Sequence, residues 1–189
     1  MRVVAVMGSP RPRSSSIAVA KHFLQLLSDG GADVQSFVLE NLKFRGCAGC
    51  YGCKRNSEKC VISDDLTPVL DAVANSDLFV MATPVYILDV PGSLKCFIDR
   101  TFSYMPPDFY MEGGKRTRWT SSKKMFTIIT QAQVVKFEVA ARYEAYYGSI
   151  GFTCKNLHLL GVGLKEDIIQ SRPEVGEQLV TIAKEYLGK

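Results

Sequence analysis

The sequence is poor in histidine, the side chain most often used in acid–base catalysis, and has no long apolar run. Only two histidines occur among its 189 residues, and we expect His22 and His158 to lie on the surface or in the core rather than in a catalytic role. No apolar run approaches the roughly 20 residues that cross a membrane, and the run at 3–7 is too short for a secretory signal. The net charge of +4 is too small to indicate a nucleic-acid partner by itself. We therefore expect a cytoplasmic protein that binds neither membranes nor nucleic acids.

Extended and helical patterns alternate along the whole chain, without an internal repeat or a linker. Short apolar runs predict five strands, over residues 3–7, 34–39, 78–82, 125–130 and 157–162. Helical spacing predicts five helices between and after them, over residues 14–29, 64–75 with two aspartates as its cap, 92–102, 135–149 and 173–187. Strands that alternate with helices predict an α/β fold with a doubly wound parallel sheet.

The loop after the first strand suits a phosphate. Residues 8–16 read Gly-Ser-Pro-Arg-Pro-Arg-Ser-Ser-Ser and lead directly into a predicted helix. The first backbone N–H groups of that helix, the serine hydroxyls and the Arg11 guanidinium are all donors that a phosphate can use. The loop has neither the ending of a Walker A loop nor the G-x-G-x-x-G pattern of dinucleotide sites. A capped helix with surface arginines is the alternative.

The loop after the third strand could bind a planar ring. It reads Thr-Pro-Val-Tyr over 83–86, where the proline stiffens the chain and Tyr86 presents a flat side chain. Parallel strands end at one edge of the sheet, so this loop and the phosphate loop suit the two ends of one FMN molecule. The long segment 103–122 shows no period, and we expect it either to cover the flavin or to form a subunit interface.

Four of the six cysteines lie close together, and the spacing indicates a metal centre. They are Cys47, Cys50, Cys53 and Cys60. Overlapping Cys-x-x-Cys steps can direct several sulfurs inward, and four thiolates bind one [4Fe–4S] cluster. A zinc site usually has two separated pairs, so the spacing favours iron and sulfide, with zinc or free thiols as alternatives. We expect this segment at the same sheet edge as the two loops, and Cys96 and Cys154 in the core.

These motifs resemble the NADPH-dependent FMN reductase family, which has a flavodoxin-like fold. The resemblance is carried by Gly8-Ser9-Pro10-Arg11 with the serines that follow, Thr83-Pro84-Val85-Tyr86, and Pro91-Gly92-x-Leu94-Lys95-x-Phe97-Ile98-Asp99-Arg100. The cysteine segment, with Asp64-Asp65 behind it, resembles the iron–sulfur flavoprotein branch of that family. The resemblance implies one flavodoxin-like, FMN-binding domain over 1–189, with a five-stranded parallel sheet, helices on both faces, and residues 41–65 as a cysteine-bearing insertion.

The resemblance also implies where FMN and the cluster would bind. The implied phosphate ligands are Ser9, Arg11, Ser14, Ser15 and Ser16; the implied ring contacts are Pro84, Val85, Tyr86 and Ile87, bordered by Thr130 and Gln131; the implied cluster ligands are Cys47, Cys50, Cys53 and Cys60. Two positions depart from the family pattern. Serines at 15 and 16 replace the frequent Asn-Thr, and Gln131 replaces a common glycine, so it either crowds the ring or donates to it.

The implied function is that of an FMN-dependent oxidoreductase with NAD(P)H as donor, in which the flavin supplies the chemistry and no catalytic side chain is needed. With a cluster, the resemblance implies one-electron transfer between the cluster and FMN. It also implies a homodimer or homotetramer, with the cluster of one subunit near the flavin of another, and a small-molecule or protein redox partner. A cluster-free NAD(P)H-dependent FMN or quinone reductase and a non-enzymatic flavin electron carrier are the alternatives.

Overall fold

A five-stranded parallel sheet forms the centre of the protein, as predicted. The structure is a computed structural model that describes residues 1–55, 57–163 and 167–189. The strands within these ranges are β1 (Arg2–Met7), β2 (Asp33–Val38), β3 (Leu78–Pro84), β4 (Lys123–Thr130) and β5 (Phe152–Leu159). Their order in the sheet is β2-β1-β3-β4-β5. The order reverses between β1 and β3, so the loops that follow these two strands open beside each other at the carboxyl edge.

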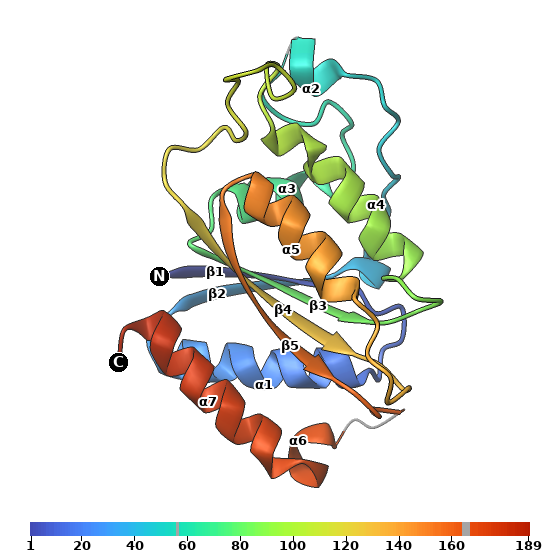
Figure 1. Cartoon of the computed structure of the whole chain (residues 1–189), viewed down its shortest axis with the longest axis vertical. Coiled ribbons are helices and arrows are strands. Elements are labelled where there is room, and N and C mark those ends of the chain that lie inside the picture. Colours follow the sequence, from blue (N-terminus) through green and yellow to red (C-terminus); the bar gives the residue numbers. More distant parts are fainter. Residues whose placement is uncertain (56, 164–166) are drawn as a thin grey trace.

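Helices cover both faces of the sheet (Figure 1). One face carries α1 (Ser15–Asp29), α6 (Ile168–Ser171) and α7 (Pro173–Leu187), and the other carries α3 (Thr67–Ala74), α4 (Gly92–Arg100) and α5 (Val139–Ser149). The short elements are α2 (Gly52–Arg55) and the 3-10 helices η1 (Leu39–Asn41) and η2 (Thr101–Tyr104). In the described ranges, no helix is both long enough and apolar enough to cross a membrane.

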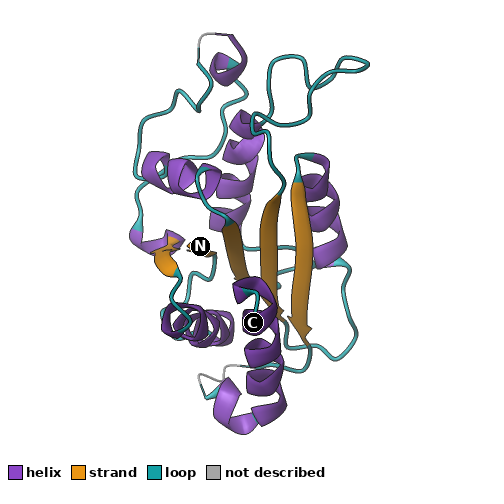
Figure 2. Cartoon of the chain, turned by 90° about the vertical axis from the view of Figure 1, so that its left-hand side faces the viewer, coloured by secondary structure: helices purple, strands orange, loops and turns teal. Residues whose placement is uncertain are grey.

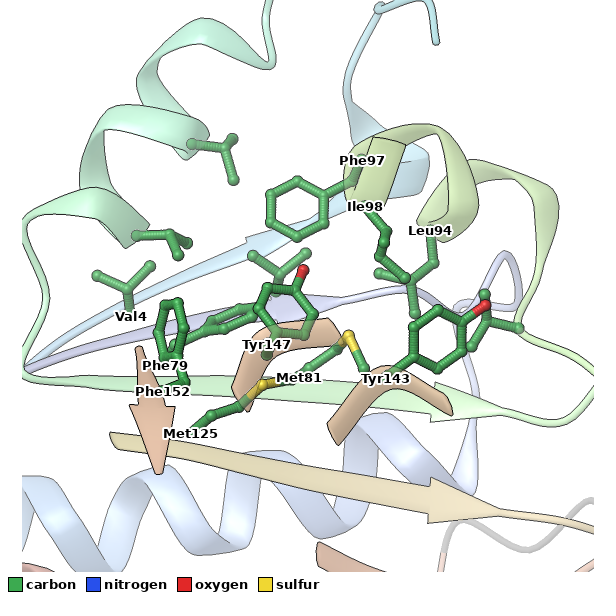
Figure 3. Close-up of a cluster of buried hydrophobic side chains, with 14 of the residues drawn as sticks. Val4, Phe79, Met81, Leu94, Phe97, Ile98, Met125, Tyr143, Tyr147 and Phe152 are labelled. Carbon is green, nitrogen blue, oxygen red and sulfur yellow. The ribbon is translucent and has the colours of Figure 1, made fainter. Parts of the chain in front are cut away.

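The central strands read as continuous apolar runs because both of their faces are covered. Alternate residues of β1 and β3 enter different cores: Val4 and Phe79 face α3, α4 and α5, whereas Val3 and Leu78 face α1 and α7. Figure 3 shows the first of these cores, where Phe97 of α4 and Tyr147 of α5 pack over Phe79. This packing fixes α4 on the sheet, and both the loop after β1 and the cysteine segment contact this helix.

Three predicted elements begin at least three residues from their expected start. Strand β5 begins at Phe152 rather than at residue 157 and ends at Leu159 rather than at 162. It is an edge strand with several exposed residues, so it lacks the apolar run by which the inner strands were identified. Helix α5 begins at Val139 rather than at 135, because residues 132–136 are an exposed loop. Helix α3 begins at Thr67 rather than at 64, with Leu66 as its N-cap residue. Of the two aspartates expected to cap it, Asp64 accepts the Leu66 N–H at its Oδ1, at 3.1 Å, whereas Asp65 accepts from the Lys43 N–H.

The long segment before β4 packs against the cysteine segment. Lys54 of α2 donates to the carbonyl oxygens of Phe102 and Met105, at 2.5 and 2.6 Å. Arg118 donates to the carbonyl oxygen of Cys53 at 2.7 Å. Figure 2 shows α2 and the loop after η2 together at one end of the molecule, and we call α2 with residues 101–119 the cap. The cap precedes β4, and its Phe102, Met105 and Phe109 line a cavity together with Arg142 and Tyr143 of α5. The expectation that this segment covers the flavin or forms a subunit interface stays a prediction.

Candidate functional site

The predicted phosphate loop turns its hydroxyl groups inward. Ser9, Ser14, Ser15 and Ser16 are all buried. Ser14 is the N-cap residue of α1, yet its hydroxyl does not cap the helix and instead lies 2.9 Å from the Ser16 hydroxyl. The Ser15 hydroxyl donates to the carbonyl oxygen of Gly163 at 3.1 Å. A row of buried hydroxyls at the start of a 15-residue helix is an arrangement suited to an anion.

Arg11 supplies the cation of this loop and fits a bound phosphate. Its backbone N–H donates to the Ser9 hydroxyl at 3.3 Å. Its side-chain Nε is buried and has no hydrogen-bond partner among the described residues. A buried guanidinium N–H without an acceptor is unfavourable, and a phosphate oxygen in the loop would satisfy it. The loop therefore fits the phosphate of FMN.

The phosphate loop lies directly against α4, the helix that follows the predicted ring loop. A Cβ atom at Gly8 would lie 2.6 to 2.9 Å from three side-chain atoms of Leu94, so only glycine allows this approach without a shift. The Gly8 N–H also donates to the carbonyl oxygen of Ala82 in β3, at 2.8 Å. These contacts place the first loop beside the end of β3, as a single FMN site requires.

The predicted ring loop is a tight turn with an apolar tip. Tyr86 and Asp89 exchange backbone hydrogen bonds of 2.7 and 3.0 Å, with Ile87 and Leu88 between them. Both central residues have positive φ, 45° and 65°, which is strained for a β-branched isoleucine. The side chain of Ile87 is 96% exposed. Val85, in front of the turn, donates its N–H to the carbonyl oxygen of Thr130 at 2.9 Å, which ties the turn to β4.

Asp89 anchors this turn to α5. The Tyr143 hydroxyl donates to its carboxylate at 2.5 Å, and Arg142 forms an ion pair with it. Burial raises the pKa of Asp89, but the hydrogen bonds from Tyr143 and the Val90 N–H and the charge of Arg142 outweigh it, so the pKa lies below its ordinary value. The sequence offered no local signal for this anchor, because Asp89 and Tyr143 are distant in the chain.

Gln131 organises its own loop. Its side-chain amide donates to the carbonyl oxygens of Gln133 and Val135, at 3.1 and 2.6 Å. Its oxygen accepts from the Phe137 N–H at 3.4 Å and from His158 Nε2 at 2.7 Å. His158 is half-buried on β5, and burial lowers its pKa. The polar atoms of Gln131 are thus engaged within the protein, and a ring contact at this loop would have to use other atoms.

The cysteine segment, described except for residue 56, runs back along α4. Cys47 lines a cavity of about 600 Å³ together with Lys95, Ile98 and Asp99 of that helix. Cys60 lies against Arg100, the last residue of α4. Leu94, near the first residue of the same helix, meets the phosphate loop. The prediction that the segment shares the carboxyl edge with the flavin loops is therefore wrong for Cys60, because it lies at the far end of α4.

The chemistry of the cysteine segment fits an iron–sulfur cluster, although its sulfurs are not assembled around one point. The Gly49 N–H donates to Cys47 Sγ at 3.5 Å, and Arg100 Nε donates to Cys60 Sγ at 2.9 Å. Lys54 lies beside Cys53; burial lowers the pKa of this ammonium, and the neighbouring thiol partly opposes the shift. Such donors are typical around cluster ligands. Within the described ranges, no three His, Cys, Asp or Glu side chains are gathered as a metal site.

Residues 1–127 match the family described as NADPH-dependent FMN reductase. The chain belongs to this family. The match includes the phosphate loop, the cysteine segment and the ring loop of this FMN reductase family member, whereas Thr130 and Gln131 lie beyond it. The predicted family is thereby confirmed.

Curated relatives support the predicted branch. An iron-sulfur flavoprotein of Archaeoglobus fulgidus is 34% identical over 104 residues, which are 55% of this chain and 47% of that protein. An iron-sulfur flavoprotein of Methanocaldococcus jannaschii is 30% identical over 101 residues, 53% of this chain and 52% of that protein. The chain thus matches about half the length of these relatives.

Solved structures confirm the flavodoxin-like fold. An FMN-dependent NADH-azoreductase from Bacillus anthracis in complex with FMN superposes with a TM-score of 0.72 at 14% identity, covering 97% of this chain and 100% of that one. An NAD(P)H:quinone oxidoreductase from Methanothermobacter marburgensis gives a TM-score of 0.69 at 16% identity, covering 99% and 97%. At these identities the likeness shows the fold alone.

Proposed function

We propose that this protein is an FMN-dependent oxidoreductase of the NAD(P)H-dependent reductase type. The observation that carries the proposal is the buried Arg11 Nε, which lacks a partner among the described residues and lies in a loop of buried serines. The name of the family that matches residues 1–127 supports the same cofactor. When bound, FMN supplies the exchange of electrons with a nicotinamide donor and an acceptor.

The chain's own residues would bind and orient the flavin. In the proposal, the phosphate is held by Ser9, Arg11, Ser14, Ser15 and Ser16, and the ring by Pro84, Val85, Tyr86 and Ile87, with Thr130 and Gln131 at its border. The short ties from Val85 to Thr130 and from Asp89 to Tyr143 support a preorganised ring loop. A rigid loop loses little conformational entropy when the cofactor binds.

The proposal includes a [4Fe–4S] cluster on Cys47, Cys50, Cys53 and Cys60. Its support is the set of N–H donors that face three of these sulfurs, together with the names of the curated relatives. The segment would have to close to bring the four sulfurs together. Closure would require movement of the stretch before α2, which has no regular secondary structure and carries the exposed Cys47 and Cys50.

The proposed setting is a homodimer or homotetramer in the cytoplasm, with a small-molecule or protein redox partner. The exposed apolar tip at Ile87 is a feature that subunit contacts commonly cover. All six cysteines are free thiols, which persist in reducing compartments. A cluster-free NAD(P)H-dependent FMN or quinone reductase and a non-enzymatic electron carrier are the competing functions.

Anaerobic purification separates these functions. We expect a preparation with stoichiometric FMN, iron and sulfide that oxidises NADPH or NADH in the presence of an acceptor. FMN and full turnover without iron would favour the cluster-free reductase. FMN with negligible NAD(P)H oxidation, but rapid reduction by a ferredoxin-type donor, would favour the electron carrier. Protein that neither retains nor rebinds FMN would overturn the proposal.

A further inference from the structure

Among the described residues, Arg100 is the largest fully buried side chain, with 1% of its surface exposed. A guanidinium group has five N–H donors. Nε donates to Cys60 Sγ at 2.9 Å, Nη1 to the Arg45 carbonyl at 3.0 Å and to Asp64 Oδ2 at 2.9 Å, and Nη2 to the Ile62 carbonyl at 2.9 Å and to Asp64 Oδ1 at 3.3 Å. Every acceptor of this buried cation belongs to the cysteine segment.

These acceptors lie at both ends of the segment. Arg45 precedes Cys47, and Asp64 follows Cys60, so one side chain on α4 joins the entry and the exit of the loop. A second tie lies next to the first: the Lys43 N–H donates to Asp65 Oδ2 at 2.8 Å, and the Asp65 N–H donates back to the Lys43 carbonyl at 3.4 Å. Joining the ends reduces the conformational entropy that the loop must lose when it assembles around a metal centre.

A buried arginine is unfavourable unless its charge is paired and its donors are satisfied. Asp64 supplies the paired charge, and its side chain is only 13% exposed. Burial raises the pKa of Asp64, but the hydrogen bonds from Arg100 and the Arg45 N–H outweigh it and keep the pKa below its ordinary value. The ion pair between Arg100 and Asp64 is enough to hold the segment on α4. The hydrogen bond from Arg100 Nε to Cys60 Sγ is not needed for that purpose, so it calls for a separate explanation. A donor aimed at a ligand sulfur is one of the determinants of a cluster's potential.

We propose that Arg100 is a positioning residue, which closes the cysteine segment and holds Cys60 Sγ in place as a ligand of the cluster. The inference rests on the proposed cluster. Arg100 thus has two separate roles: it joins the two ends of the segment, and it holds the sulfur of Cys60. The first can be tested whether or not iron is present.

The test is Arg100→Lys, which keeps the positive charge and loses the fork of donors. The matched control is Arg172→Lys, because Arg172 also donates to two carbonyl oxygens, of Leu160 and Gly161, but lies far from the cysteines. Three properties of the anaerobic proteins are measured: iron content, the midpoint potential of the cluster, and the rate of tryptic cleavage after Lys54 and Arg55. FMN content reports on the integrity of the fold.

We expect Arg100→Lys to be cleaved about tenfold faster or more, because the closed loop opens locally. We expect it to lose most of its iron, and the cluster that remains to have a more negative potential, because a donor to its sulfur is gone. FMN content and all properties of Arg172→Lys should match the wild type. Wild-type iron content and potential in Arg100→Lys would overturn the assignment of Cys60, and wild-type cleavage would overturn the closure of the loop.

Asp64→Asn keeps the experiment decisive if Arg100→Lys does not fold. It weakens the ion pair but retains the donor to Cys60, so we expect faster cleavage with a potential close to that of the wild type. If the midpoint potential of the cluster in Asp64→Asn shifted as far as it does in Arg100→Lys, the proposal would be contradicted. If the wild-type protein contains no iron, the proposed cluster is wrong, while the cleavage rates still decide whether Arg100 closes the segment.

Discussion

Removing the guanidinium of Arg11 should weaken FMN binding without destabilising the flavin-free protein. Its buried Nε has no partner among the described residues, so Arg11→Ala removes an unsatisfied donor from the empty loop. In the complex the same change removes a charged hydrogen bond to phosphate, worth about 1.5–3 kcal/mol. Since 1.4 kcal/mol corresponds to about tenfold in affinity, the dissociation constant of FMN should rise about 10- to 150-fold.

Titration of the flavin-free protein with FMN, followed by flavin fluorescence, measures this change. Riboflavin lacks the phosphate, so its affinity should be the same for Arg11→Ala and for the wild type. Arg116→Ala is the matched control, because the guanidinium of Arg116 donates to the Phe109 carbonyl within the cap rather than to the phosphate loop. An FMN affinity within about twofold of the wild type, or an equal loss for riboflavin, would refute the assignment of Arg11 to the phosphate.

Three further outcomes follow from the burial and the hydrogen bonds of individual side chains. The Thr127 hydroxyl is buried without a partner in the part of the chain that the structure describes, so Thr127→Val should raise the free energy of unfolding by about 1 kcal/mol, measured in urea. The pKa of Asp89 in the folded protein lies below its ordinary value of 3.8. Asp89→Asn should therefore lower the free energy of unfolding by its full amount above that pH, and this difference from the wild type should shrink as the pH falls through the folded pKa. A difference in urea unfolding that stays constant down to the most acid pH would contradict this. After iron removal, iodoacetamide at about pH 8 should modify exposed Cys50 and spare Cys154, whose pKa burial raises to about 11; mass spectrometry of the peptides identifies the labelled thiol.

The inner strands could be predicted from the sequence because each is a short run of residues buried on both sides. β1 and β3 appear as predicted to within two residues, since no competing pattern occurs there. β5 is half exposed, so local hydrophobicity gives no clear start. Helix α5 begins late because the side chain of Gln131 holds the preceding loop in a non-helical shape, and a contact of that kind has no local sequence signature.

The candidate site could be predicted where its residues are neighbours in the chain. The phosphate loop and the four cysteines are local motifs of this kind. The contacts that position them are long-range: Arg100 and Asp64 are 36 residues apart, and Tyr143 and Asp89 are 54 apart. The position of Asp64 and Asp65 before α3 predicts a helix cap, but it gives no sign that Asp64 also pairs with Arg100 and that Asp65 accepts from the Lys43 N–H, because both partners are distant in the chain.

The length of helix α4 bears on how independently the phosphate loop and the cysteine segment can change in sequence. Its nine residues span about 13 Å, with the phosphate loop against Leu94 in its first turn and the cysteine segment on Arg100 at its last residue. Leu94 and Arg100 are six residues apart, about 9 Å along the helix, and sites at that separation contribute nearly additively to stability only where they share no partner. Substitutions around Cys60 should therefore disturb the flavin loops less than substitutions around Cys47, which shares a cavity with Lys95 and with Arg142, the partner of Asp89.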